Sequence, residues 1–176
     1  MRIGVIGTHC VGKTTIVEEL QQQLPDYEFY SEPYYQLEDQ GFIFSAVPTV
    51  DDYIEQFDYS AKQILESGEN AIFDRCPIDL FAYIQASGAL QEISIFYRKI
   101  ENMQSDLDLL IFVPIEEPDR IVCSELPDLR FEVNEIIYDL IETLDIKTIK
   151  VNGDISQRIN QIKVALTDLL LDTDSN

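Results

Sequence analysis

Eight consecutive residues near the N-terminus carry the clearest chemical signal in this sequence. Gly7 to Thr14 spell Gly-Thr-His-Cys-Val-Gly-Lys-Thr, which fits the phosphate-loop pattern G-x-x-x-x-G-K-[ST]. The glycines let the backbone turn tightly enough for successive N–H groups to face phosphate oxygens. Lys13 is expected to reach the β- and γ-phosphates, and the Thr14 hydroxyl to bind a Mg²⁺ held by them. The pattern predicts that the chain binds a nucleoside triphosphate.

The residues on either side of this loop fit the same interpretation. Residues 2–6 form a short apolar run typical of a buried strand, and residues 13–24 have helical spacing. The N-terminal dipole of such a helix faces the phosphates. His9 and Cys10 occupy variable positions of the loop and are interpreted as spacers near the nucleotide. The predicted nucleotide contacts are Gly7, Thr8, His9, Cys10, Val11, Gly12, Lys13, Thr14 and Thr15.

Short apolar runs alternate with helical patterns along the rest of the chain. Further strands are predicted at 27–30, 71–74, 109–113 and 148–151. Helices are predicted at 50–65, 78–86 and 90–103, around 136–144, and from a capping-box-like start at Asp154 and Gln157 onward. This order predicts an α/β fold, with a parallel sheet covered on both faces and a ligand at the carboxyl ends of its strands. We expect one domain over residues 1–171 and a frayed tail over 172–176.

Besides Lys13, four charged residues outside the phosphate loop are candidates for catalysis, and each has a structural alternative. Asp74 ends a strand where it could hold a metal, or it could cap the next turn. Arg75 could grip phosphate oxygens in a bidentate way, or form a surface ion pair. Glu32 precedes a proline and could act as a general base, or simply suit a helix N-terminus. Arg130 lies at the exit of a polar segment, 114–128, which could be a lid. It could offset the charge of a transferring phosphoryl group, or it could pair with a neighbouring acid such as Glu132. Arg120 within the segment is interpreted as paired with a neighbouring acid.

The composition is strongly acidic, with 12 basic and 33 acidic residues and a formal charge of −21. Such a surface argues against binding nucleic acid or an anionic membrane. Three widely spaced cysteines argue against a disulfide framework and a structural zinc site. The sequence shows no signal-peptide pattern and no long apolar run, so a cytoplasmic location is expected. A homodimer is also compatible with the sequence.

Together these motifs resemble the small P-loop nucleoside and nucleotide kinases, and most closely the NadR-like (ribosylnicotinamide kinase-like) AAA-type P-loop domains. The resemblance rests on residues 7–14, 31–33 and 74–79, on 128–133, and on 152–158. It implies a three-layer α/β/α sandwich with five parallel strands in the order 2-3-1-4-5 and a lid after strand four. It also implies that Glu32 is an acceptor-side acid, that Asp74-Arg75 is a D/E-R pair, and that Asn152-Gly153 lies beside the adenine.

The resulting hypothesis is a kinase that uses ATP and Mg²⁺ to phosphorylate a hydroxyl or phosphate of a small molecule, a nucleoside or nucleotide first of all. Its predicted catalytic residues are Lys13, Glu32, Asp74, Arg75 and Arg130, with Thr14 and Asp74 as metal ligands. Candidates for the acceptor pocket are Tyr34, Tyr35, Gln56, Tyr59 and Tyr83. The competing hypothesis is an ATP-binding switch with slow or no turnover that engages a protein partner.

Overall fold

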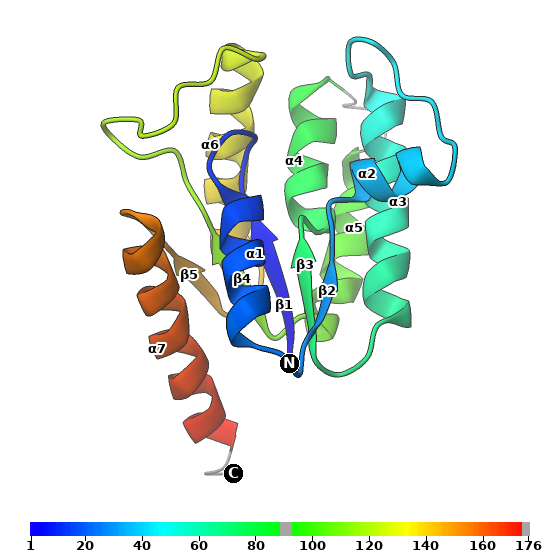
Figure 1. The fold of residues 1–176 in the computed structure, drawn as a ribbon. Helices are drawn as coiled ribbons and strands as arrows, with labels where there is room; N and C mark the ends of the chain where they lie inside the picture. The colour runs from blue at the N-terminus through cyan, green and yellow to red at the C-terminus, as the bar shows by residue number, and fades with distance from the viewer. Residues whose placement is uncertain (89–92, 174–176) are drawn as a thin grey trace.

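A computed structural model describes residues 1–88 and 93–173, and these form an α/β sandwich around one parallel sheet (Figure 1). The sheet order is β2-β3-β1-β4-β5, as the resemblance implied. Ile3 of the central strand aligns with Ile72 on one side and Leu109 on the other. The strands are β1 (Arg2–Ile6), β2 (Glu28–Tyr30), β3 (Ala71–Asp74), β4 (Leu109–Phe112) and β5 (Thr148–Lys150).

Helices cover both faces of the sheet, because the strands are apolar on both sides. Ile3 and Val5 face the core layer of α1 and α7, whereas Ile6 belongs to the layer of α3 to α6. This alternation follows from the two-residue period of a strand. The helices are α1 (Lys13–Gln23), α2 (Pro33–Asp39), α3 (Val50–Glu66), α4 (Pro77–Ala86), α5 (Ile93–Met103), α6 (Pro127–Thr143) and α7 (Ile155–Thr173), with a 3₁₀ turn at Gln104–Asp106.

All predicted strands and helices are present, but α2 was not among the predicted helices, and α6 begins nine residues before the predicted stretch around 136–144. The reciprocal capping bonds predicted before α7 are present, since each backbone N–H of Asp154 and Gln157 donates to the other side chain, both at 2.9 Å. Helix α7 continues to Thr173, so the first two residues of the predicted frayed tail are helical, and 174–176 lie outside the described residues. Residues 90–92 of the predicted fifth helix also lie outside them. None of the described helices is long and apolar enough to span a membrane.

The polar connection predicted after the fourth strand is an irregular segment that joins β4 to α6. Helix α6 begins at Pro127, one residue before the predicted end of this segment at 128, because proline suits the first turn of a helix. We call residues 114–126 the lid segment. In Figure 1 it loops out next to the turn between β1 and α1, which holds the phosphate-loop motif. The fold thus places the two predicted halves of a nucleotide site side by side.

Candidate functional site

The phosphate loop, residues 7–14, has the backbone that its glycines predicted. Gly7 has a φ of 151°, and a Cβ there would lie 2.5 Å from the carbonyl oxygen of Val113. Gly12 has a left-handed φ of 89° and is the N-cap of α1. No side chain caps α1, and its first turn contains no acid. The N-terminal N–H groups of α1 and its dipole are therefore suited to an anion.

Lys13 is 5% exposed, and its Nζ donates to the carbonyl oxygen of Thr8 at 2.8 Å. Burial, and next the positive charge of Arg75, lower the pKa of Lys13 to about 8. Nearby carboxylates offset only part of this shift. A bound polyanion would favour the charged ammonium again, so the side chain suits the phosphate contact that the motif predicts.

Asp74 ends β3 beside the phosphate loop. The Thr14 hydroxyl donates to Asp74 Oδ2 at 2.8 Å, while Oδ1 is buried with no hydrogen-bond partner. Burial raises the pKa of Asp74, although Lys13 opposes the shift. A buried carboxylate oxygen without a donor next to a hydroxyl offers the hard oxygen ligands that Mg²⁺ prefers. The described residues hold no group of three or more His, Cys, Asp or Glu that could bind a metal unaided, so phosphate oxygens would have to complete such a site.

Arg75 is buried at the centre of an ion-pair cluster, not in a surface pair. Its Nε donates to Glu32 Oε1 at 2.5 Å, and its Nη1 donates to Asp79 Oδ2 at 3.2 Å. Burial alone would lower the pKa of Arg75, but the two carboxylates outweigh it and raise the pKa well above its ordinary value. Its backbone has a φ of 75°, a costly conformation for a residue with a side chain. The surrounding contacts hold the guanidinium in one place.

Asp79 is the member of this cluster to which sequence reasoning gave no role. It is fully buried, accepts the backbone N–H of Cys76 at 2.9 Å and pairs with Arg75. Burial raises the pKa of Asp79 to about 6. The sequence around the start of α4 could have indicated that Asp79 is structurally important. An acid at position N3 of a helix that begins with a proline often closes a capping box, as Asp79 does in α4.

Glu32 is the N-cap residue of α2, yet its side chain makes no capping hydrogen bond. Its carboxylate instead accepts from Arg75. Burial works to raise the pKa of Glu32, but the Arg75 and Lys13 cations outweigh it and lower the pKa. Glu32 is therefore an anion at neutral pH and can accept a proton or a hydrogen bond.

A cavity of about 300 Å³ lies next to this cluster, and we call it the acceptor cavity. Of the predicted pocket residues, Tyr34, Gln56 and Tyr83 line it, whereas Tyr35 and Tyr59 do not. Gln56 is buried, and its amide donates to the carbonyl of Asp52. The full lining is His9, Glu32, Tyr34, Phe44, Ser45, Ala46, Pro48, Asp52, Tyr53, Gln56, Arg75, Leu80, Tyr83, Glu125 and Leu126.

His9 lines this cavity as well, so it is more than the spacer that its loop position suggested. Its Nε2–H donates to the carbonyl of Glu125 at 2.8 Å, and its Nδ1 lies 2.9 Å from the Tyr83 hydroxyl. Because a carbonyl only accepts, the proton sits on Nε2 and the tyrosine donates to Nδ1. Burial, with added repulsion from nearby cations, lowers the pKa of His9. The imidazole is neutral at pH 7 and links the phosphate loop to the lid segment.

Arg130 lies at the outer side of the phosphate loop and does not line the acceptor cavity. It is 2% exposed, donates to the carbonyls of His9 and Cys10 at 3.1 Å each, and pairs with Asp119. Its predicted contact with a transferring phosphoryl group stays a prediction. Arg120 pairs with a neighbouring acid, Glu116, as expected.

The predicted adenine turn is bound to the start of the lid segment. The N–H of Gly153 donates to Glu116 Oε1 at 2.9 Å, and Arg158 donates to the same oxygen at 2.7 Å. Arg158 also donates to the carbonyl of Val11 at 2.7 Å. In this conformation the lid segment, the phosphate loop and the turn after β5 form one hydrogen-bonded unit.

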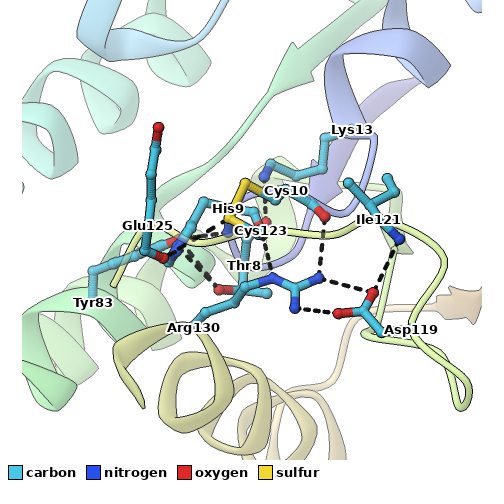
Figure 2. The surroundings of a disulfide bond; sticks show 10 residues. All are labelled: Thr8, His9, Cys10, Lys13, Tyr83, Asp119, Ile121, Cys123, Glu125 and Arg130. Carbon is cyan, nitrogen blue, oxygen red and sulfur yellow. Dashed lines mark hydrogen bonds and ion pairs between the residues drawn. A yellow bond between two sulfur atoms is a disulfide. The ribbon is translucent and has the colours of Figure 1, made fainter. Parts of the chain in front are cut away.

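A disulfide joins Cys10 of the phosphate loop to Cys123 of the lid segment (Figure 2). The sequence argued against a disulfide framework and gave no indication of this single bond, while Cys76 is free and buried. The two Cα atoms are 5.9 Å apart, an ordinary span for such a bond, across a sequence separation of 113. Spacing along the chain gives no signal of a pair that only the folded lid segment brings together.

Comparison with known proteins agrees with this geometry. A family model described as AAA domain matches residues 2–158. The chain belongs to this AAA domain family. No curated protein matches its sequence. Among solved structures, this AAA domain is similar to deoxyadenosine kinase from M. mycoides with bound dATP, at 20% identity and a TM-score of 0.64, over 95% of this chain and 100% of that one.

Two further structures resemble the same AAA domain. NadR in complex with NAD and AMP-PNP is 20% identical with a TM-score of 0.68, over 92% of this chain and 48% of that protein. Shikimate kinase from Aquifex aeolicus is 20% identical with a TM-score of 0.61, over 97% and 99% of the two chains. At these identities the likeness shows the fold, and the fold is that of P-loop kinases.

Proposed function

We propose that this AAA domain uses ATP and Mg²⁺ to phosphorylate a small hydroxyl compound of nucleoside size. The proposal rests on one observation: the phosphate loop and the acceptor cavity lie next to each other. The phosphate loop and the acceptor cavity share His9, and Arg75 contacts both, since it lines the cavity and its Nη1 lies 3.4 Å from the Gly7 carbonyl oxygen. Among the similar structures, deoxyadenosine kinase contains bound dATP and NadR contains AMP-PNP, which supports a nucleotide at this loop.

Catalysis in this proposal comes from positioning and charge. Lys13 and Arg75 are buried cations that would stabilise the negative charge that develops on the transferring phosphoryl group. Glu32, held as an anion in the wall of the acceptor cavity, would orient the acceptor hydroxyl and accept its proton. Thr14 and Asp74 would hold Mg²⁺, which would neutralise part of the negative charge of the phosphates.

The charges around the acceptor cavity favour a nucleoside over a nucleotide. Its wall carries three acids, Glu32, Asp52 and Glu125, while its one cation, Arg75, is already paired with two carboxylates. A phosphate on the acceptor would find no uncommitted positive charge there. The aromatic lining suits a planar ring instead: Tyr34 stacks on Phe44 with ring centroids 4.3 Å apart.

The proposal is tested by acceptor-stimulated ADP release with a panel of nucleosides, nucleotides and other small hydroxyl compounds. With the best acceptor, Glu32→Gln should lower turnover by roughly 10²–10⁴-fold and leave the affinity for AMP-PNP near that of the wild type. Glu55→Gln, the same change at an exposed position of α3, is the matched control and should turn over normally.

Two results would contradict this function. Normal turnover by Glu32→Gln would remove Glu32 from the reaction. Binding of AMP-PNP without any acceptor that stimulates ADP release would favour the alternative, an ATP-binding switch that engages a protein partner. In that case AMP-PNP alone should change hydrogen exchange in the lid segment, and no small hydroxyl compound should add to the change.

A further inference from the structure

The far end of the lid segment is fixed to two consecutive residues of the phosphate loop, His9 and Cys10. Cys123 is bonded covalently to Cys10, and two residues later the carbonyl of Glu125 accepts the Nε2–H of His9 at 2.8 Å. Figure 2 shows both links. Residues 123–125 therefore lie along the loop that is expected to hold the triphosphate.

The near end of the lid segment is packed just as closely. Arg130 donates both to Asp119 of the lid segment and to a carbonyl of the loop. Arg158 donates both to Glu116 of the lid segment and to the carbonyl of Val11 in the loop. The space enclosed between the lid segment and the outer side of the loop is about 10 Å³. That is room for a single water molecule at most, so the lid segment lies directly against the outer side of the loop, which carries the carbonyl groups. The lid segment is closed on the loop.

The contacts that hold it closed differ in kind. The ion pairs involve carboxylates that are partly open to solvent: the side chains of Asp119 and Glu116 are 33% and 14% exposed. Such contacts break and re-form as a lid opens on the microsecond-to-millisecond timescale. A disulfide instead persists for minutes to hours unless a thiol reacts with it. The bond between Cys10 and Cys123 is therefore the one contact in this set that thermal motion does not release.

We propose that Cys10 and Cys123 form a reversible, redox-sensitive latch. In the oxidised form the bond holds the lid segment and the phosphate loop together, so that the loop cannot adjust around a bound triphosphate. A dithiol reductant releases the lid segment and makes the loop available to MgATP. This goes beyond the phosphotransferase proposed above, because it concerns when the site can be filled.

The chemistry of the latch is thiol–disulfide exchange. A thiolate of the dithiol attacks the sulfur of Cys123, which lies next to Val122, a residue 98% exposed. The Cys10 sulfur leaves as a thiolate at the loop that precedes α1, where the helix dipole favours an anion. The second thiol of the reductant then displaces Cys123 from the mixed disulfide. The protein gains two electrons and two protons, and the dithiol becomes a cyclic disulfide.

The test compares full-length protein before and after reduction with dithiothreitol, with the redox state verified by intact mass. Calorimetry with AMP-PNP and Mg²⁺ should show affinity at least about tenfold higher in the reduced form, because the apparent affinity falls with the fraction of protein that is competent to bind. Cys123→Ser should bind like the reduced wild type with or without dithiothreitol. Cys76→Ser, which changes the third and buried cysteine, is the matched control and should keep the full response to reduction.

Equal affinity in the two redox forms would overturn the latch, and so would three free thiols in protein treated with a thiol oxidant. Hydrogen exchange of the lid segment without nucleotide gives a readout independent of ATP. Reduction should speed exchange there in the wild type and change nothing in Cys123→Ser, and an unchanged rate in the wild type also overturns the latch. If exchange responds but neither form binds AMP-PNP, the proposed phosphotransferase and the control of MgATP binding both fail, and only the redox-dependent motion of the lid segment stands.

Discussion

The lowered pKa of Lys13 makes the pH dependence of nucleotide binding a direct test of the site. In the free protein, burial and the charge of Arg75 lower this pKa to about 8. The neutral amine is therefore the main form of the free protein above that pH. A bound triphosphate places anionic oxygens near Nζ and stabilises the ammonium, so binding above pH 8 must take up a proton. The affinity for ATP is expected to fall as the pH rises.

The size of this effect follows from the pKa. Above the pKa of the free group, the dissociation constant rises about tenfold for each pH unit, as long as the complex keeps the lysine charged. Between pH 7 and about 9.5 the affinity should weaken by roughly thirtyfold, or about 2 kcal/mol. Below about pH 7, Lys13 is charged both in the free protein and in the complex, so it does not make the affinity depend on pH.

The assay is calorimetry of AMP-PNP binding with Mg²⁺ to reduced protein, repeated in buffers of different ionisation enthalpy. Near pH 9.5 the number of protons taken up should approach one per bound nucleotide. Near pH 7 Lys13 should contribute almost nothing to this proton uptake. Lys13→Arg is the matched control, because a guanidinium stays charged throughout and its affinity should not depend on pH in this range. An affinity of the wild type that stays constant from pH 7 to 9.5, or an equal slope in Lys13→Arg, would refute the reasoning.

Two further substitutions test the residues around the loop. Asp74→Asn should raise the Mg²⁺ concentration needed for AMP-PNP binding, because an amide is a poorer ligand for a hard cation. An unchanged Mg²⁺ titration would mean that Asp74 does not bind the metal and has only a structural role. Arg130→Ala should lower the free energy of unfolding by about 1–3 kcal/mol and weaken AMP-PNP binding, because Asp119 and the carbonyls of His9 and Cys10 lose their donor. Denaturant unfolding and calorimetry check both effects, whereas slower transfer with normal stability and affinity would indicate the phosphoryl contact predicted from the sequence.

Local sequence patterns determined the elements of this fold and the centre of its candidate site. Glycines at 7 and 12 indicated the loop because left-handed backbone and close approach to Val113 exclude other residues. Runs of apolar residues indicated the strands, and their order came from the resemblance to P-loop kinases, not from periodicity. Asp74 and Arg75 followed from their place at the end of β3, because the carboxyl ends of parallel strands meet at one edge of a sheet.

The tertiary structure decided which distant groups meet, because those distances depend on the sheet order and on the path of the lid segment. It brought Cys123 to Cys10 across 113 residues and turned His9 toward the acceptor cavity. It also placed Arg130 against backbone carbonyls that no sequence pattern marks. Burial also shifted the pKa values of charged groups in the site. The pKa of Lys13 is lowered only because the fold removes its ammonium from water and places it near a second cation, Arg75.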